Sequence, residues 1–362
     1  MKNNAKILVF PKDKNPYQEL LYSPLREKRI KIEYAFPRYS SQVLSLLFLI
    51  PSLFYHKLKG YRLFHLHWTG GFSSPNRFLR IPYSVYFLFM LRYLKILNYR
   101  IVWTVHNILP HEKQFFNDLA CRKVLSAFAD AKIAHSSSTI EEMKKLKMNT
   151  ADTFVIPIGS YAGIYENRVS KEKARKCLGL NRNDFIFLFF GGIKGYKGLD
   201  DLLPAFYELT KKEKNARLVI AGTCNDSKLT YLIKKYEKIL GRNLIFKPGF
   251  VEDGKVQHYF NSSDVAVFPF KKVTTSSSAI LALAFARPII VPEMGCLEEL
   301  PSDAGFFYSP NEKNALYDAM RSAIKNKANL RVMEKKALDY AKSLSWDKIA
   351  EKTYEVYSSL IE

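Results

Sequence analysis

Short apolar runs alternate with helical patterns along this chain of 362 residues, and that alternation limits its fold more than any other feature. Parallel sheets covered by helices on both faces have this pattern, because a helix connects each strand to the next. The pattern occurs twice. Strands are predicted at 6–10, 30–35, 62–67, 100–105, 131–135 and 154–156, and again at 185–190, 217–221, 244–247, 265–269 and 289–291.

The repeated pattern predicts an α/β protein with two Rossmann-like, doubly wound parallel-sheet domains that face a central cleft. A linker-like stretch at 158–169 sets the expected boundaries. These are an N-terminal domain at 1–165, a C-terminal domain at 166–343 and a C-terminal helix at 344–362. Open α/β sheets bind ligands beyond the carboxyl ends of their strands, so residues at those ends are the candidates for function.

The charge of the chain indicates an anionic partner. Fifty-six Lys and Arg against 34 Asp and Glu give a formal net charge of +22. Nucleic acid, anionic lipid and phosphorylated small molecules all fit this charge. No nucleic-acid-binding module is recognisable and paired lysines beside acids are typical of a solvated face, so no nucleic-acid partner is expected. The four cysteines lack metal-ligand spacing and are expected to be free thiols in a reducing compartment.

Two apolar segments, 43–55 and 81–97, fall short of the roughly 18 uninterrupted apolar residues of a membrane span. Each is interpreted either as a helix packed in the core or as an interfacial helix resting on anionic lipid. The second interpretation predicts a cytoplasmic protein held peripherally on the inner face of the plasma membrane.

A glycine-rich turn follows the apolar run 185–190. It reads Gly191-Gly192-Ile193-Lys194-Gly195-Tyr196-Lys197-Gly198, and a helical pattern begins at Leu199. Backbone N–H groups at Gly191 and Gly192 and the two lysines would converge on an anion such as a diphosphate. The spacing matches neither a P-loop nor the dinucleotide GxGxxG motif, and a plain strand-to-helix loop is the alternative.

Histidines gather at predicted strand ends in the first half of the chain. Five of the seven lie at or near such ends. An isolated histidine is usually structural, but His106 ends a strand before a polar loop and is a stronger candidate. His65 and His67 alternate along one strand and no Cys or carboxylate has ligand spacing to them, so no metal site is expected.

At these residues the chain resembles glycosyltransferases of the GT-B fold, in the superfamily of the family 4 transferases. Residues 192–198 are similar to their G-x-I-R-x-Y-K-G segment, whose two basic residues hold the donor diphosphate. The other similar segments are Asn15-Pro16-Tyr17 in the first loop, His106 at a T-x-H strand end, Pro248-Gly249-Phe250-Val251, Gly295-Cys296-Leu297-Glu298-Glu299, and Trp346 at the start of the last helix.

The resemblance implies a metal-independent hexosyltransferase without a cofactor, acting in cell-surface polysaccharide synthesis. Its donor is a nucleoside-diphosphate sugar, with GDP-mannose favoured and UDP-sugars next, and its acceptor is a glycan or a lipid-linked sugar. The implied donor-binding residues are Gly191, Gly192, Lys194, Lys197, Gly249, Phe250, Thr275, Ser276, Ser277 and Glu299. The implied acceptor-binding residues are Asn15, Tyr17, Trp68, Thr69 and Gly70. The candidate catalytic residues are His106, Glu112 and His67, with His111 and Glu19 as further candidates for a base.

One departure concerns the stereochemistry of transfer. Retaining relatives carry two glutamates with seven residues between them, at the positions where this chain has Val273 and Leu281. A hydroxyl-rich run, 274–278, replaces the acids at a predicted helix start, where it would bind phosphate or sugar or act as a simple N-cap. This acid-free pattern is similar to a subset that includes exopolysaccharide β-mannosyltransferases, and it makes an inverting reaction the alternative to a retaining one.

Two other functions fit the same fold. The missing acids fit a sugar- or nucleotide-binding protein with reduced catalysis, and a nucleotide-sugar epimerase is an alternative enzyme. The retained lysine turn argues against the first alternative, and the two apolar segments are not expected of the second.

Overall fold

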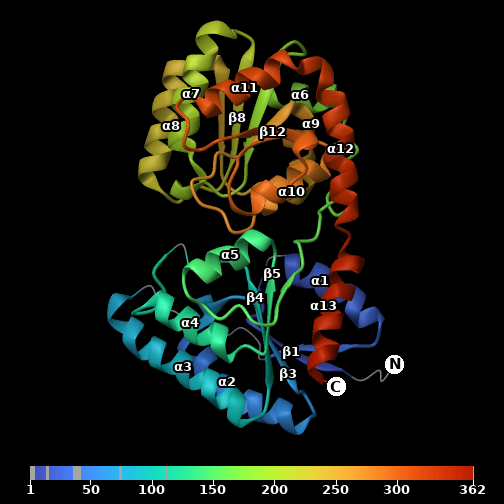
Figure 1. Cartoon of the computed structure of the whole chain (residues 1–362). Coiled ribbons are helices and arrows are strands. Elements are labelled where there is room, and N and C mark those ends of the chain that lie inside the picture. Colours follow the sequence, from blue (N-terminus) through green and yellow to red (C-terminus); the bar gives the residue numbers. More distant parts are fainter. Residues whose placement is uncertain (1–4, 14–15, 36–41, 73–75, 111, 362) are drawn as a thin grey trace. The chain divides into compact units, whose positions relative to one another are not determined.

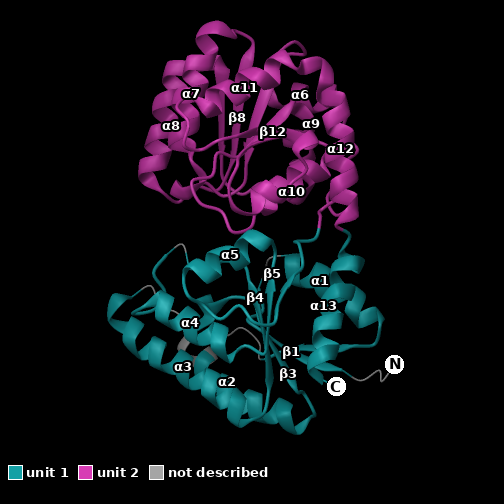
Figure 2. Ribbon diagram, in the orientation of Figure 1, with its two compact units in different colours: residues 1–159, 345–362 teal, residues 160–344 magenta. Residues whose placement is uncertain are grey.

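The computed structural model describes residues 5–13, 16–35, 42–72, 76–110 and 112–361, which Figure 1 traces in colour. The chain forms two compact units. The first comprises Met1–Gly159 and Ser345–Glu362, and the second comprises Ser160–Leu344 (Figure 2). Where the sequence suggested a separate C-terminal helix at 344–362, the structure makes that helix part of the first unit.

The first unit is built on a parallel six-stranded sheet with the order β2-β1-β3-β4-β5-β6. Its central strands are buried because helices cover both faces of the sheet. The strands are β1 Lys6–Phe10, β2 Lys31–Tyr34, β3 Leu63–Leu66, β4 Arg100–Val105, β5 Ala131–Ala134 and β6 Thr153–Val155.

Alternate side chains of these strands enter different layers. Leu8, Phe64 and Trp103 belong to an apolar core with residues of α2 (Gln42–Leu58), α3 (Arg80–Ile96) and α4 (Asp118–Phe128). On the other face, α1 (Pro16–Glu27) packs against α13 (Trp346–Ile361), as Figure 1 shows. A further helix, α5 (Ser137–Lys145), begins directly after β5 at the N-cap Ser136.

The second unit repeats the architecture with the order β12-β11-β10-β7-β8-β9. One face packs on α7 (Leu199–Lys212), α8 (Ser227–Leu240) and α11 (Ala315–Lys325), which share its apolar core. The other face carries two helix pairs, α6 (Lys171–Leu178) with α9 (Asp253–Ser262), and α10 (Ser277–Ala284) with α12 (Leu330–Ser343). The strands are β7 Phe185–Phe190, β8 Ala216–Gly222, β9 Leu244–Pro248, β10 Val265–Val267, β11 Ile289–Pro292 and β12 Gly305–Tyr308.

The prediction of two doubly wound parallel sheets is confirmed. The strand missing from the prediction is β12, a Gly-Phe-Phe-Tyr run that pairs with β11 at the edge of the second sheet. It is a short strand at the end of the sheet, and three of its four residues are only half-buried. A four-residue run that begins with glycine is a weak strand signal.

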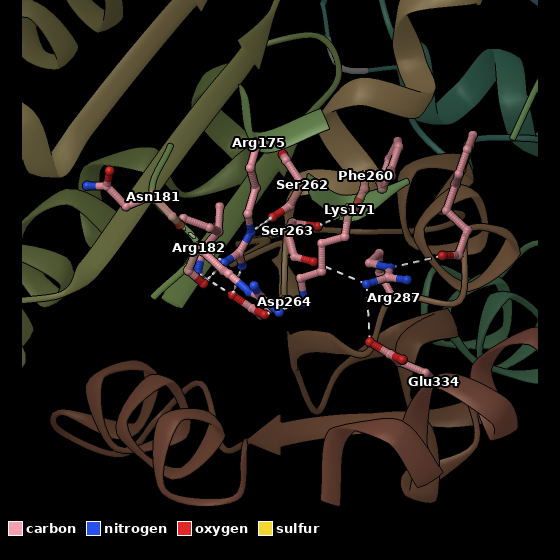
Figure 3. Close-up of polar contacts among 12 residues, drawn as sticks. Lys171, Arg175, Asn181, Arg182, Phe260, Ser262, Ser263, Asp264, Arg287 and Glu334 are labelled. Atoms are coloured by element: carbon pink, nitrogen blue, oxygen red, sulfur yellow. Dashed lines mark hydrogen bonds and ion pairs between the residues drawn. The ribbon is translucent and has the colours of Figure 1, made fainter. Parts of the chain in front are cut away.

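A largely buried ionic network joins several segments at the amino edge of the second sheet (Figure 3). Asp264, directly before β10, forms ion pairs with Arg175 at 2.8 Å and with Lys171 at 2.6 Å. It also accepts a hydrogen bond from the N–H of Ile186 at 2.7 Å. Arg287 extends the network, because its guanidinium donates to the Ser263 carbonyl and to Glu334 of α12, each at 3.1 Å. Because this edge is opposite the carboxyl ends of the strands, we interpret the network as structural.

Candidate active site

The glycine-rich turn lies at the carboxyl end of β7, where the sequence predicted it. Gly191 has φ +114°, and a Cβ there would stand 3.0 Å from Ser278 Oγ and 3.5 Å from Lys197 Nζ. A Cβ on Gly198, at φ +72°, would collide with the carbonyl oxygen of Pro269 at 1.8 Å. Only glycine fits both positions, so the turn brings Lys197 and Ser278 close to the Gly191 backbone.

The backbone donors of this turn differ from the expectation in one respect. The Gly191 N–H donates to the Ala221 carbonyl at 3.0 Å, so Gly191 contributes space at this turn rather than a free N–H donor. The N–H of Gly192 donates no backbone hydrogen bond among the described residues, and Gly192 is exposed. Gly192 is therefore the available backbone donor of the predicted pair.

Lys197 is a half-buried cation without an acidic partner among the described residues. Burial, with a smaller effect of Lys194, lowers the pKa of Lys197 to about 8. The nearby Lys271 shows the opposite behaviour, because it pairs with Asp200 at 2.5 Å and Asp201 at 3.2 Å, and these contacts raise its pKa. The acids closest in sequence to Lys197 are thus bound to another lysine.

The hydroxyl-rich run precedes and begins α10. Ser276 caps that helix, its Oγ accepting the N–H of Ala279 at 3.2 Å, so the N-cap interpretation holds for this residue. Thr275 is half-buried and Ser277 is exposed. Ser278, in the first turn of α10, is the hydroxyl closest to Gly191, although the candidate list from sequence stops at Ser277.

The remaining predicted donor residues lie on either side of the turn. Phe250 follows β9 and is 82% exposed, while Glu299 follows β11 and is also exposed. The strand order places β9 and β11 on opposite sides of β7. A separate hollow of about 940 Å³ between α7 and α11 is lined by Lys271, Tyr308 and Tyr317 and by none of the predicted donor residues.

A cluster of four histidines occupies the carboxyl edge of the first sheet. His67 Nδ1 is 3.2 Å from His106 Nε2, and His106 Nδ1 is 3.3 Å from His135 Nε2. Two tyrosines from opposite ends of the sequence complete it. Tyr22 contacts His67 Nε2 at 2.6 Å and His65 Nδ1 at 2.9 Å, and Tyr357 contacts His65 Nδ1 at 2.6 Å. We call these six residues, together with Thr104, the histidine cluster; Thr104 Oγ1 lies 2.7 Å from His65 Nε2.

The histidine cluster is uncharged. Burial lowers the pKa of His65 to about 3 and that of His135 to about 4. Burial and the neighbouring histidines hold the pKa values of His67 and His106 well below the usual range. Burial also raises the pKa of Tyr22, so its hydroxyl stays protonated. At neutral pH all these rings are therefore neutral hydrogen-bonding groups.

Aromatic rings surround His106. Its imidazole stacks on Trp68 with ring centres 4.4 Å apart and planes 9° apart, and Tyr17 meets it edge-on at 4.8 Å. Tyr17 also contacts Trp346 at 5.3 Å. Trp68 is half-exposed, so the stack places an indole ring at the protein surface beside the predicted catalytic histidine.

The other candidates of the first unit are distributed around this cluster. Glu112 is exposed after β4, Glu19 pairs with Arg26 at 2.8 Å, and Thr69 donates to Gln114 Oε1 at 2.8 Å beside the exposed Gly70. Asn15 and His111 lie outside the described residues. Sequence reasoning did not select His135 as a site residue, although the strand-end rule that selected His106 applies equally to the residue after β5.

Within the described ranges, no group of three or more His, Cys, Asp or Glu side chains is arranged to hold a metal ion. The histidine cluster illustrates the reason. Its ring nitrogens face one another and two tyrosines, and they do not converge on a common point.

Residues 170–340 match the family described as Glycosyl transferases group 1. This segment is a group 1 glycosyltransferase domain. It coincides almost completely with the second unit, so the glycine-rich turn, Lys197 and the α10 hydroxyls all belong to the glycosyltransferase domain.

Curated proteins similar to this chain are named as glycosyltransferases as well. An uncharacterized glycosyltransferase of Methanocaldococcus jannaschii is 26% identical, over 66% of this chain and 64% of its own length. A lipopolysaccharide 1,2-N-acetylglucosaminetransferase of Salmonella typhimurium is 23% identical over 62% and 61%. A GDP-mannose:glycolipid 4-beta-D-mannosyltransferase of Xanthomonas campestris is 21% identical over 74% and 73%. The chain thus spans less than two thirds of the first two relatives.

Solved structures match the whole chain. Sucrose-phosphate synthase from Thermosynechococcus elongatus has a TM-score of 0.77 at 18% identity and covers 99% of both chains. Anabaena HepE in complex with UDP-glucose has a TM-score of 0.73 at 16% identity, covering 98% of this chain and 99% of its own. This likeness shows that both units of the chain follow the GT-B fold that the sequence motifs suggested.

Proposed function

We propose that the protein transfers a hexose from a nucleoside-diphosphate sugar to a hydroxyl of a glycan or lipid-linked acceptor. The observation that carries the proposal is the state of Lys197. The half-buried ammonium group has no acidic partner among the described residues, and its ring contact with Phe270 at 5.9 Å does not replace the lost solvation, as its lowered pKa reflects. A bound diphosphate would supply the missing negative charge.

The chemistry follows from the charge that develops in transfer. The bond between the sugar C1 and the diphosphate oxygen breaks, and the diphosphate leaves with the electron pair. A new bond forms between C1 and the acceptor oxygen, whose proton passes to a base or to water. Lys197, the exposed Lys194 and the Gly192 N–H stabilise the leaving diphosphate, which lowers the barrier without a metal ion.

GDP-mannose is our first choice of donor and a UDP-sugar the second. The name of the Xanthomonas relative supports GDP-mannose and a glycolipid acceptor. The HepE structures with UDP and UDP-glucose support the second choice. In this proposal the exposed ring of Phe250 after β9 and the exposed Glu299 after β11 contact the nucleoside from either side of the turn.

Thermal-shift and calorimetric titrations with GDP, UDP, ADP and dTDP test the donor. We expect one of the four nucleotides to bind. Lys197→Met should lower the affinity for that nucleotide. Lys214→Ala is the matched control, because it removes an exposed lysine charge just before β8, at the amino edge of the same sheet. Binding to none of the four nucleotides, or equal binding by Lys197→Met and wild type, would contradict the proposal.

The outer surfaces of α2 and α3 support a membrane-linked acceptor. Both helices expose an apolar stripe at helical spacing where a surface helix normally carries polar residues. In the described ranges no helix is long and apolar enough to cross a membrane. The large exposed side chains of these stripes and of the turn before α3 are Leu47, Phe48, Phe54, Tyr55, Leu58, Phe78, Leu79, Ile81, Val85, Phe89 and Ile96.

The charge of the same segment matches an anionic surface. From Tyr34 to His111 the sequence holds no Asp or Glu, yet it contains nine Lys and Arg. Apolar side chains with basic neighbours and no acids are the composition of helices that lie in the headgroup layer of anionic lipid. We therefore propose that α2 and α3 hold the protein on the cytoplasmic face of the plasma membrane, where a lipid-linked acceptor is available.

Vesicle sedimentation tests this attachment. The protein should bind vesicles of phosphatidylglycerol and phosphatidylcholine at low salt, and bind phosphatidylcholine alone weakly. The double variant Val85→Ser, Phe89→Ser should lose binding, whereas Tyr231→Ser, which removes an equally exposed aromatic ring from α8, should keep it. If the wild-type protein does not sediment with anionic vesicles at low salt, the proposed attachment is excluded.

A further inference from the structure

The histidine cluster contains a continuous chain of hydrogen bonds with one fixed end. It runs from the backbone carbonyl of Ile156 to His135 Nδ1 at 2.9 Å, and then through His106 and His67 to the hydroxyl of Tyr22. A carbonyl oxygen only accepts hydrogen bonds. His135 must therefore carry its proton on Nδ1, which leaves a lone pair on its Nε2.

This fixed end determines every proton along the chain. His106 Nδ1 faces the lone pair of His135, so His106 carries its proton on Nδ1 and donates it. His106 Nε2 is then a lone pair, and His67 Nδ1 donates to it. His67 Nε2 accepts in turn from the Tyr22 hydroxyl. All four donors point toward Ile156, and each imidazole is held in the Nδ1–H form.

We propose that His106 and His67 act as neutral positioning residues held in the Nδ1–H tautomer by His135, and that neither is the base that deprotonates the acceptor. The geometry excludes the base role because both ring nitrogens of His106 already face ring nitrogens of other histidines. A substrate hydroxyl has no lone pair of His106 to reach. The part of the proposal that concerns the base rests on the proposed function, whereas the tautomers do not.

The described side chains that are seen to contact the cluster are uncharged at neutral pH. The groups packed around it are Tyr17 and Tyr22 from α1, Thr104 from β4, and Trp346 and Tyr357 from α13. None carries a charge at neutral pH, and burial lowers the pKa values of the histidines themselves. A proton added at His106 Nε2 would face the Nδ1–H of His67, which leaves two donors with no acceptor between them.

Holding the tautomer has a structural result at the surface. The ring of His106 cannot rotate without breaking two hydrogen bonds, so its stacking on Trp68 is fixed as well. The half-exposed indole of Trp68 thus stacks on a ring that is itself held by hydrogen bonds, and we infer that it offers an aromatic surface to a sugar ring of the acceptor. The predicted catalytic histidine and the predicted acceptor-binding tryptophan form one stacked pair.

Nuclear magnetic resonance of the full chain with ¹⁵N-labelled histidine tests the tautomers directly. Two-bond ¹⁵N–¹H correlations distinguish a protonated ring nitrogen from an unprotonated one. We expect Nδ1–H patterns for His67, His106 and His135, unchanged between pH 5.5 and pH 8. An Nε2–H pattern at His106, or its protonation within this range, would overturn the proposal.

Two substitutions at opposite ends of the chain make the test sharper. His135→Phe removes both the donor to the Ile156 carbonyl and the acceptor for His106 Nδ1. His106 should then show a mixture of Nδ1–H and Nε2–H tautomers and titrate. Tyr22→Phe removes only the last donor, so the three tautomers should stay as they are. Equal responses to the two substitutions would contradict a chain anchored at Ile156. If His135→Phe fails to fold, the wild-type and Tyr22→Phe spectra still decide the question.

An activity measurement separates this proposal from the proposed function. Glu112, an exposed carboxylate with no hydrogen bond or ion pair to a described residue, is the candidate base close to the end of β4 that the structure describes. In an inverting reaction Glu112→Gln should lower kcat by a factor of about 100 or more while nucleotide affinity is kept. Nδ1–H tautomers in a protein that transfers no sugar would refute only the function. Titrating histidines in an active transferase would refute only the positioning role.

Discussion

The two units each bury a polar cluster, but the clusters differ in charge and in position. In the second unit, Asp264 connects Lys171 and Arg175 through full charges at the amino edge of the sheet. In the first unit, His67, His106 and their partners form a neutral cluster at the carboxyl edge of the other sheet. Both clusters join segments distant in sequence, but only the neutral one lies at the edge where ligands of such sheets bind.

This difference indicates what each kind of cluster is suited for. A buried ion pair is costly to break, because removing one partner leaves the other charged and desolvated. Neutral imidazoles carry no such penalty, and their orientation depends on which nitrogen holds the proton. Ion pairs thus hold segments of the second unit together. In the first unit, the position of the proton on each imidazole determines how the side chains of the candidate site are oriented.

Asp264→Ala tests the ionic side of the comparison and should have the largest effect. It leaves Arg175 without its carboxylate and the Ile186 N–H without its acceptor. We expect the free energy of unfolding to fall by about 3–5 kcal/mol. Urea unfolding followed by circular dichroism measures it, with Asp303→Ala as a control because Asp303 forms an exposed pair with Lys336. A loss no larger than that of the control would show that the network is not the scaffold we describe.

Lys197→Met tests a charge that is buried without an acidic partner among the described residues. Nucleotide affinity should fall about tenfold to a hundredfold, the worth of a hydrogen bond to a charged group. Stability without nucleotide should not fall, because the substitution removes a desolvated cation. Calorimetry and thermal melting provide the two readouts. A large loss of stability with unchanged affinity would make Lys197 a structural residue instead.

The pH dependence of the same lysine gives a smaller, signed effect. Its pKa is about 8 in the folded protein against an ordinary 10.5, so between these values the unfolded chain binds more protons. Stability without nucleotide should therefore rise with pH in that window, compared with Lys197→Met. Nucleotide affinity should fall over the same window as the charge is lost. Titrations at pH 7 and pH 9 check this, and Lys197→Arg should abolish the fall.

Tyr357→Phe should have the smallest effect, because it removes one neutral hydrogen bond to His65 and leaves no charge exposed. We expect a loss of about 0.5–1.5 kcal/mol in the free energy of unfolding. A loss as large as that of Asp264→Ala would remove the distinction between the two clusters. The same urea experiment measures both variants.

Most helices and strands could be predicted from the sequence, but the contacts between residues far apart in the chain could not. The apolar run 185–190 and the glycines after it define β7 and its turn, because both signals are local. The contact between His65 and Tyr357 joins residues 292 positions apart, and no periodicity encodes such a pair. The isolation of Lys197 depends in the same way on Lys271 occupying the nearby acids, which only the folded loop reveals.

The position of α13 has a consequence for synthesis on the ribosome. The first unit needs its last helix, because Tyr357 and Trp346 complete the packing around His65 and Tyr17. Translation delivers the second unit, residues 160–344, before that helix emerges. During synthesis from the N-terminus, all residues of the second unit are therefore available before the first unit is complete. The strands of the first unit are made early, but α13 packs against them only later. The candidate acceptor side is thus assembled only after residues 345–361 have left the ribosome.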